Sequence, residues 1–234
     1  GEVRLTLRQN IVIPFVKEEL VPYFYQELEK LGFVEAGYNK AVDITACPGT
    51  DTCNLGIASS TGIADELERV IKAEYPQYLE NQDLVIKISG CMNACGQHNM
   101  ANIGFQGMTV RTKDKLIAPA LQVLLGGGNL GDGNGVFADK VVKVPSRRGP
   151  EALRRILDDF EANAHGKQFV EYYREKGEKY FYNFLQDLQD VTNLTQEDFI
   201  DWGSEEKFVK AIGVGECAGV VIDLIATLFL ESEE

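Results

Sequence analysis

Two stretches, Cys47-Pro-Gly-Thr-Asp-Thr-Cys53 and Cys91-Met-Asn-Ala-Cys95, decide how this sequence folds. The first pair of cysteines has C-x5-C spacing and the second has C-x3-C spacing. An apolar segment that predicts a β-strand precedes each pair, at residues 41–46 and 84–88. Glycine and proline at the ends of these strands let the chain turn sharply, so that several thiols can converge there.

Four thiolates are the ligand set of an iron–sulfur cubane. Structural zinc is a competing interpretation, but zinc sites built from four cysteines favour C-x2–4-C spacing, and the first pair here is longer. A third interpretation is that the cysteines are unliganded core residues. The fifth cysteine, Cys217, lies far from both pairs along the chain, and we expect it to pack as a small apolar side chain.

The composition is that of a soluble globular protein of one or two domains, with 234 residues, 44% hydrophobic and 25% charged. Most of the net charge of −13 lies in residues 151–234, which argues against nucleic acid or an anionic membrane as a partner. No apolar run has the length of a membrane span, and the N-terminus does not resemble a signal peptide. An odd number of cysteines without such a signal favours a reducing, cytoplasmic setting.

Hydrophobic periodicity predicts an α+β fold, a mixed β-sheet with flanking helices. A strand over residues 2–13 and a helix over 21–31, ending at Gly32, form a small β–α unit in front of it. Further strands are expected in the core at residues 103–105, 108–111, 121–125 and 140–144, and helices at 58–72 and 150–162. The first two of these strands would pair around Gln106-Gly107.

A helical C-terminal extension is expected to follow the core. Residues 169–188 read as one helix rich in aromatic side chains, which we expect to be core rather than a cofactor site. An apolar helix is expected over 219–230, and its abrupt acidic end suggests partners outside this chain.

The residues flanking the cysteines resemble a known family. The stretches at 46–56 and 90–107, the opening Leu5-Thr-Leu-Arg-Gln-Asn-Ile-Val-Ile-Pro14, the loop 124–128 and the segment 143–148 resemble the siroheme nitrite and sulfite reductases. The resemblance covers roughly residues 2–165 and, more weakly, the chain to residue 188. It implies a ferredoxin-like half-domain at 1–37, a 4Fe–4S and siroheme-binding domain at 38–165, and a helical extension at 166–234.

The resemblance also implies roles for individual residues. Its cluster ligands match Cys47, Cys53, Cys91 and Cys95, and Cys95 matches the ligand that bridges the cluster to the siroheme iron. Asn93 matches a position close to both cofactors, where it would tune their potential, unless it only forms the turn. The glycine-rich loop that lies against the siroheme matches Gly126, Gly127, Gly128 and Asn129, and an ordinary flexible loop is the alternative.

Three further polar residues are open to two interpretations. His98 could donate a proton or bind a siroheme carboxylate, but we expect a structural role. Arg147 and Arg148 could pair with siroheme carboxylates or with an acidic partner surface, or they could be solvated at the start of a helix.

The implied activity is the six-electron reduction of sulfite to sulfide or of nitrite to ammonia. Its partners would be the N-terminal half of the same enzyme and an electron donor, either ferredoxin or a flavoprotein. We expect the isolated chain to be inactive, because the family's substrate-binding Arg and Lys come largely from the first half. Alternatives are a 4Fe–4S electron-transfer module without siroheme, and a scaffold domain that has lost its metals. The sequence leaves both substrates open.

Overall fold

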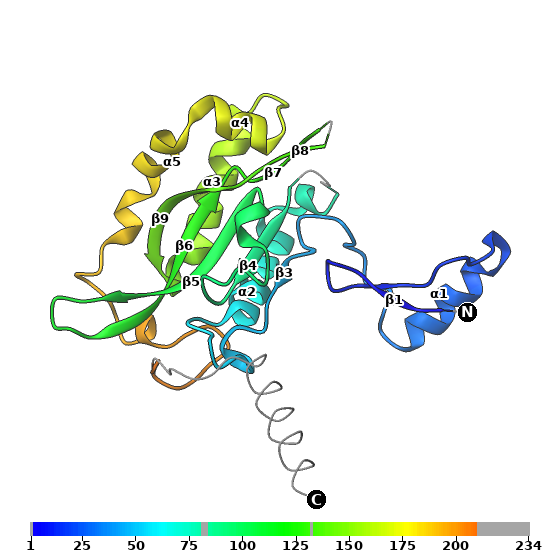
Figure 1. The fold of residues 1–234 in the computed structure, drawn as a ribbon, viewed down its shortest axis with the longest axis horizontal. Coiled ribbons are helices and arrows are strands. Elements are labelled where there is room, and N and C mark those ends of the chain that lie inside the picture. Colours follow the sequence, from blue (N-terminus) through cyan, green and yellow to red (C-terminus); the bar gives the residue numbers. More distant parts are fainter. Residues whose placement is uncertain (1, 81–83, 132, 210–234) are drawn as a thin grey trace, which may run out of the picture.

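A five-stranded mixed sheet in the order β3-β4-β5-β6-β9 forms the centre of the protein (Figure 1). The computed structural model describes residues 2–80, 84–131 and 133–209. Strands β3, β4 and β5 run parallel to one another, whereas β6 and β9 are antiparallel to their neighbours. The strands of this sheet are β3 (Thr45–Ala46), β4 (Ile86–Ser89), β5 (Ile103–Arg111), β6 (Ile117–Leu125) and β9 (Asp139–Pro145). The expected α+β fold with a mixed sheet is confirmed.

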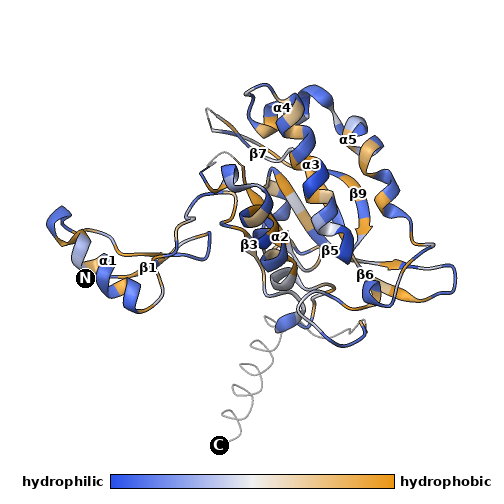
Figure 2. Ribbon diagram, turned by 180° about the vertical axis from the view of Figure 1, so that it is seen from behind, coloured by the Kyte–Doolittle hydropathy of each residue, from blue (hydrophilic) through white to orange (hydrophobic). Residues whose placement is uncertain are grey.

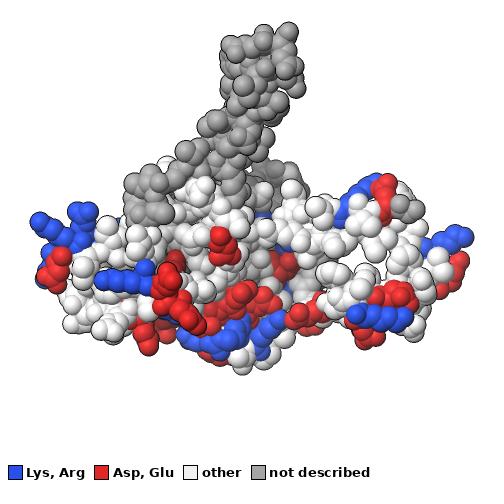
Figure 3. All heavy atoms as spheres, turned by 90° about the horizontal axis from the view of Figure 1, so that it is seen from below, with Lys and Arg blue, Asp and Glu red and all other residues white. Residues whose placement is uncertain are grey.

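Two amphipathic helices, α2 (Ser60–Glu74) and α3 (Gly149–Asn163), pack on one face of this sheet (Figure 2). Their buried apolar residues recur every three or four positions, which places them on one side of each helix. In α2 these are Ile63, Leu67, Val70 and Ile71, and in α3 they are Leu153, Ile156, Leu157 and Phe160. The solvent-exposed sides of the two helices carry ion pairs such as Lys72–Glu68 and Arg154–Glu74. Lys and Arg are accordingly interspersed with Asp and Glu on the face seen in Figure 3.

The aromatic segment forms two helices, α4 (Phe169–Lys176) and α5 (Glu178–Leu185), so the prediction of one helix over 169–188 is wrong. The chain breaks at Gly177, which adopts a left-handed φ of 77° that a helix interior does not allow. The expectation that the aromatics are core is confirmed for the buried rings of Phe169, Tyr172, Tyr173 and Phe181. The hydroxyls of Tyr172 and Tyr180 both donate to the Asp159 carboxylate, each at 2.6 Å, and so join α4 and α5 to α3.

Two further expectations are corrected. Residues 103–111 form one strand, β5, paired with β6 along its whole length, and there is no hairpin at Gln106-Gly107. A Cβ at Gly107 would lie 2.2 Å from the carbonyl oxygen of Gly90, so this glycine permits close backbone contact inside a strand and does not form a turn. The glycine-rich stretch after β6 contains a hairpin, β7 (Gly128–Gly131) and β8 (Asn134–Val136), where a loop was expected.

The N-terminal unit stands apart from the sheet domain (Figure 1). It consists of the hairpin β1 (Arg4–Leu5) and β2 (Ile11–Val12) and the helix α1 (Val21–Lys30). The single strand expected over residues 2–13 is therefore wrong. The chain reverses between Thr6 and Asn10, with Gln9 at a left-handed φ of 64°.

None of residues 2–40 is buried. The largest exposed apolar side chains of the N-terminal unit include Leu5, Leu7, Phe15, Leu31 and Phe33. The unit contacts the sheet domain through polar bonds, from the Asn10 amide to Asp43 at 3.0 Å and from the Gln9 amide to the Ala46 carbonyl at 2.7 Å. It lacks a core of its own, so its apolar face needs a further element to cover it.

The expected helix over 219–230 and Cys217 lie outside the described residues. None of the helices in the described ranges combines the length and apolar character needed to cross a bilayer.

The buried tyrosines make the fold sensitive to alkali. Burial and the bond to Asp159 raise the pKa of Tyr172 above its value of about 10 in an unfolded chain. A raised pKa in the folded state means that stability is complete below pH 10 and is lost as the pH rises further. We therefore expect the free energy of unfolding, measured with urea, to fall progressively above pH 10.

The variant Tyr172→Phe should reduce the slope of this fall, whereas Tyr23→Phe, which alters an exposed ring, should leave it unchanged. An unfolding free energy that stays constant between pH 9 and pH 12 in the unmodified protein would contradict the interpretation.

Candidate metal centre

Both cysteine pairs begin at the same edge of the sheet. Strands β3 and β4 are adjacent and parallel, with Ala46 opposite Ile88, so both strands end at that edge. Cys47 follows β3 directly and Cys91 follows β4 after Gly90. The Cys47 amide donates to the Ile88 carbonyl at 3.3 Å, which continues the ladder into the turn. Loops at the carboxyl ends of parallel strands are where ligand sites commonly form in such sheets.

The two cysteine loops are in backbone contact. A Cβ at Gly90 would lie 2.6 Å from the Cα of Gly49, which belongs to the first loop. The Gly90 carbonyl accepts the amides of Ile57 and Ala58 at 2.8 and 3.1 Å. Any side chain at position 90 would separate the loops, so glycine is needed there for proximity.

The turn that carries Cys95 is equally tight. A Cβ at Gly96 would lie 1.8 Å from the Ile88 carbonyl oxygen, and the Gly96 amide donates to the Ser89 hydroxyl at 3.0 Å. Ala94 and Gln97 adopt left-handed φ values of 58° and 59°. This strained turn folds the chain back over the end of β4 and keeps Cys95 near Cys91.

The four cysteines differ in exposure. Cys91 is buried, Cys47 and Cys53 are half-buried, and Cys95 is exposed. Partial desolvation raises the pKa of the Cys95 thiol, and the sulfurs of Cys47, Cys91 and Cys53 raise it further. The other three predicted ligands therefore lie within electrostatic reach of Cys95.

Four cysteines carried by these two loops match the number of thiolates that a 4Fe–4S cluster requires. Within the described ranges, no three side chains of His, Cys, Asp or Glu are placed to share one metal ion. In a cubane each thiolate ligates a different iron, so the four sulfurs do not have to meet at one ion.

Hydrogen bonds from the backbone and from a serine surround Cys47. The Gly90 amide donates to the Cys47 sulfur at 3.1 Å. The Ser60 hydroxyl lies 3.5 Å from the same sulfur and donates to the Cys47 carbonyl at 2.6 Å. Hydrogen bonds to sulfur stabilise thiolate charge and tune cluster potential. Sequence reasoning missed Ser60, although its place at the start of a predicted helix beside a cysteine loop was a usable signal.

The predicted siroheme-binding residues fall into two groups. Gly126 and Gly127 are buried, and a Cβ there would meet the Tyr173 ring at 2.0 Å or the Ala101 carbonyl at 2.7 Å. Gly128 and Asn129 instead line a pocket of about 670 Å³. Asn93 is exposed in the same turn as Cys95.

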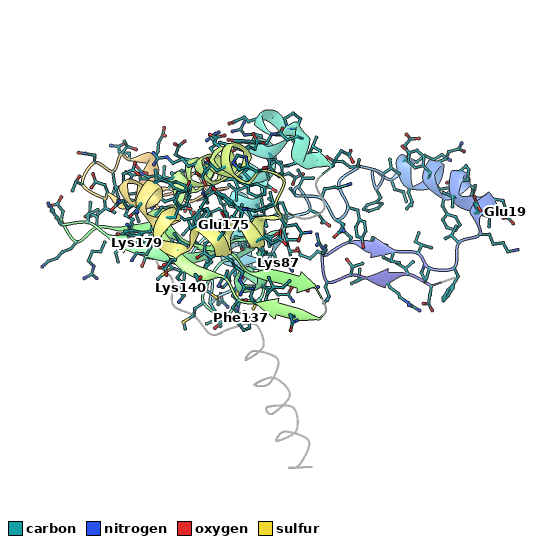
Figure 4. The ribbon with its side chains drawn as sticks, turned by 90° about the horizontal axis from the view of Figure 1, so that it is seen from above. Glu19, Lys87, Phe137, Lys140, Glu175 and Lys179 are labelled. Carbon is teal, nitrogen blue, oxygen red and sulfur yellow. The ribbon has the colours of Figure 1, made fainter. Side chains whose placement is uncertain are left out.

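Two positively charged side chains also line this pocket, and the sequence analysis did not identify them. Arg8 and Lys87 line it together with Gln97. The Lys87 ammonium donates a hydrogen bond to the Gln97 side-chain oxygen at 2.6 Å. Burial and the nearby charge of Arg8 lower the pKa of Lys87. Figure 4 shows Lys87 on the same side of the protein as Phe137, which lines the pocket too. Arg8 also forms an ion pair with Asp43 at 3.8 Å, so part of its charge is balanced, and Lys87 contributes the other positive charge at this pocket.

The remaining candidates have structural surroundings. His98 is 3% exposed, burial lowers its pKa, and its Nδ1 has no hydrogen-bond partner in the described structure. Arg147 donates to the Ile200 carbonyl at 2.9 Å, and Arg148 donates to the carbonyls of Leu188 and Asp190. Both guanidinium groups therefore bind the segment that follows the helices.

The contact between the loops can be tested by adding one methyl group. Gly90→Ala would force Gly49 and the Ala58 carbonyl away, and we expect the free energy of unfolding to fall by about 2 kcal/mol, as in overpacked sites. The matched control is Gly135→Ala, whose Cβ would make only an ordinary contact at 3.7 Å. Equal urea midpoints for the two variants would show that the loops do not depend on this contact.

Comparisons with known proteins agree with this geometry. A family model described as "Nitrite and sulphite reductase 4Fe-4S domain" matches residues 37–186. The ferredoxin–nitrite reductase of Synechococcus elongatus is 27% identical over 157 residues, which are 67% of this chain and 30% of that protein. The sulfite reductase [NADPH] hemoprotein beta-component of Bacillus subtilis is 29% identical over 113 residues, or 46% of this chain and 19% of that protein.

Among solved structures, the NirA protein of Mycobacterium tuberculosis has the same fold, with a TM-score of 0.62 and 24% identity. The match covers 76% of this chain and 33% of NirA. This chain thus spans about a third or less of the length of each of these three proteins. Because the family model covers more than half of the chain, the protein belongs to the siroheme-dependent nitrite and sulfite reductase family, whose cofactors are a 4Fe–4S cluster and siroheme.

Proposed function

We propose that this chain is the cluster-carrying C-terminal part of an assimilatory reductase that converts sulfite to sulfide or nitrite to ammonia with six electrons. The observation that supports it most directly is the convergence of four thiols at the ends of β3 and β4. Because the chain spans only part of its relatives, the activity belongs to the longer protein. The relatives include both nitrite and sulfite reductases, and the choice of anion would depend on residues outside this chain.

The protein's own residues have distinct tasks in this proposal. Cys47, Cys53, Cys91 and Cys95 would hold the cluster, and the exposed sulfur of Cys95 would also contact the siroheme iron. When bound, the two cofactors supply single electrons to the substrate. The Gly90 amide would stabilise charge at the Cys47 sulfur, and the Ser60 hydroxyl would hold the Cys47 carbonyl in place. Asn93 would act beside Cys95 by hydrogen bonding.

The pocket beside this turn suits the edge of the macrocycle. Gly128 and Asn129 line it, and Arg8 and Lys87 supply positive charge for the carboxylates of siroheme. Lys87 is held by Gln97, which follows Cys95 by two residues in the chain. Gly126 and Gly127 would act indirectly, by packing the base of the hairpin.

The missing partner is proposed to be the N-terminal half of the same enzyme. The exposed apolar face of residues 2–40 requires a cover, and a groove of about 610 Å³ runs between its hairpin and α1. A ferredoxin or a flavoprotein would donate the electrons. We place the protein in the cytoplasm, because four free thiols awaiting a cluster need a reducing compartment.

The cofactor proposal predicts the colour of the full-length protein. After anaerobic reconstitution it should show broad cluster absorption together with the Soret and red bands of siroheme. Cys91→Ser should abolish the cluster absorption, whereas Cys217→Ser, which alters the cysteine outside the two pairs, should retain it. A protein that stays colourless after reconstitution would refute the proposal.

The reductase activity gives a second test. With reduced viologen as electron donor and sulfite or nitrite as substrate, the full-length protein should show turnover and the isolated chain should not.

The pocket predicts a separate effect on siroheme. Lys87→Gln in the full-length protein should reduce siroheme per polypeptide about tenfold, because a charge-assisted hydrogen bond contributes roughly 1.5–3 kcal/mol. The cluster content should be unchanged. The control is Lys179→Gln, an exposed residue on α5 away from the pocket (Figure 4). Siroheme extraction with quantification by absorbance is the measurement. An equal siroheme content in both variants would show that Lys87 does not bind siroheme.

A further inference from the structure

The segment that follows the helices, residues 191–208, runs back across the sheet domain to the start of α2. We call it the C-terminal strap. Its apolar residues Val191, Leu194 and Phe199 pack against the β5–β6 hairpin at Val110, Ala118 and Ala120. It closes on itself where the Phe208 amide donates to the Phe199 carbonyl at 2.7 Å. Figure 1 shows the strap, in orange, beside the loop that leads into α2.

One buried carboxylate joins the strap to two other elements. Asp201 is 5% exposed. Its Oδ2 accepts the Ser59 amide at 2.7 Å, and its Oδ1 accepts the Ser146 hydroxyl at 3.0 Å and the Trp202 amide at 2.9 Å. A buried carboxylate with three donors is a strong and directional connection, since hydrogen bonds to charged groups exceed those between neutral groups.

Trp202 fixes the approach of the strap. Its indole Nε1 donates to the Ser146 carbonyl at 2.9 Å, and the Arg147 guanidinium lies 4.4 Å above its ring. A Cβ at Gly62 would lie 2.6 Å from the carbonyl of Trp202. The strap therefore packs directly against the backbone of the first turn of α2, and the contact of Arg147 with the Trp202 ring stabilises this position.

Ser59, whose amide donates to Asp201, lies in the segment that contacts both cysteine loops. Ile57 and Ala58 donate to the Gly90 carbonyl, which precedes Cys91. Ser60 donates to the carbonyl of Cys47. Ser59, between these contacts, is tied to Asp201. At the end of the strap, Phe208 and Val209 line a pocket of about 250 Å³ together with Cys53 and its neighbours.

We propose that Asp201 is a positioning residue for the cluster. By holding Ser59 it fixes residues 57–60, the segment that connects the Cys47–Cys53 loop to the turn before Cys91. The strap then positions the metal centre, although it lies beyond the residues that the family model matches. This inference rests on the proposed function, because it assigns the strap to the same cluster.

The test is Asp201→Asn in the full-length, reconstituted protein. An amide has one oxygen, so its NH₂ group would face either the Ser59 amide or the Trp202 amide, and one buried donor would lose its acceptor. We expect amide hydrogen exchange over residues 57–60 to accelerate about tenfold or more, the range that a lost buried bond produces. Iron release to a chelator should accelerate several-fold, and the electron paramagnetic resonance signal of the reduced cluster should change.

The matched control is Asp198→Asn on the same strap. Asp198 is also buried, but its carboxylate accepts hydrogen bonds from the amide and the hydroxyl of Thr195, and within the described part of the chain it forms none with α2. It should leave exchange at residues 57–60 and the cluster signal unchanged. Trp202→Phe, which loses the bond to Ser146 and part of the ring beneath Arg147 but keeps the Asp201 carboxylate, is a second variant and should shift both readouts in the same direction by less.

Three results separate the possibilities. Unchanged exchange at residues 57–60 in Asp201→Asn, with an unaltered cluster signal, would overturn the inference. Equal effects of Asp201→Asn and Asp198→Asn would also overturn it, because they would reflect general loosening of the strap. An unmodified protein that takes up no cluster would overturn the proposed function and with it the role assigned to Asp201, even if exchange showed that Asp201 holds residues 57–60.

Discussion

The site depends on the parallel pairing of two very short strand ends. Only Thr45 and Ala46 of β3 pair with β4, yet this pairing brings Cys47 beside the turn that carries Cys91. The contact of Gly49 with Gly90 then fixes the distance between the loops. Two paired residues cannot hold such a geometry alone, since each ladder bond contributes little net free energy. The surrounding bonds from Ile57, Ala58 and Ser60 make the arrangement stable.

The rest of the sheet domain serves this edge. Helix α2 leads away from the first cysteine loop and packs its apolar side on the sheet, so its N-terminal turn is held next to Cys47. The amides there are partly positive, which favours thiolate charge nearby. The antiparallel strands β6 and β9 extend the sheet away from the site and carry the hairpin β7–β8, whose first residues line the cation pocket. The four predicted cluster ligands and the pocket lined by Arg8 and Lys87 therefore lie at different parts of one domain.

Much of this could be predicted from the sequence because the decisive signals are local. The alternation and apolar runs gave β4 and the helix spacing gave α1, α2 and α3 to within a few residues, and the cysteine spacing predicted a shared site. Two of the failures share a cause, which is the conformational role of a glycine. Gly107 was read as a turn but permits contact with Gly90 within a strand, and Gly177 was overlooked although it divides a helix. Contacts between residues far apart in the sequence, such as that of Asp201 with Ser59, leave no local pattern at all, and neither does the placement of Arg8 and Lys87 at one pocket.

The elevated pKa of Cys95 has a consequence for how the metal centre is assembled. As a proposed cluster ligand, Cys95 would have to give up its proton when iron binds, so assembly would release protons into the solvent. Acidic buffer would oppose such a reaction and mildly alkaline buffer would favour it.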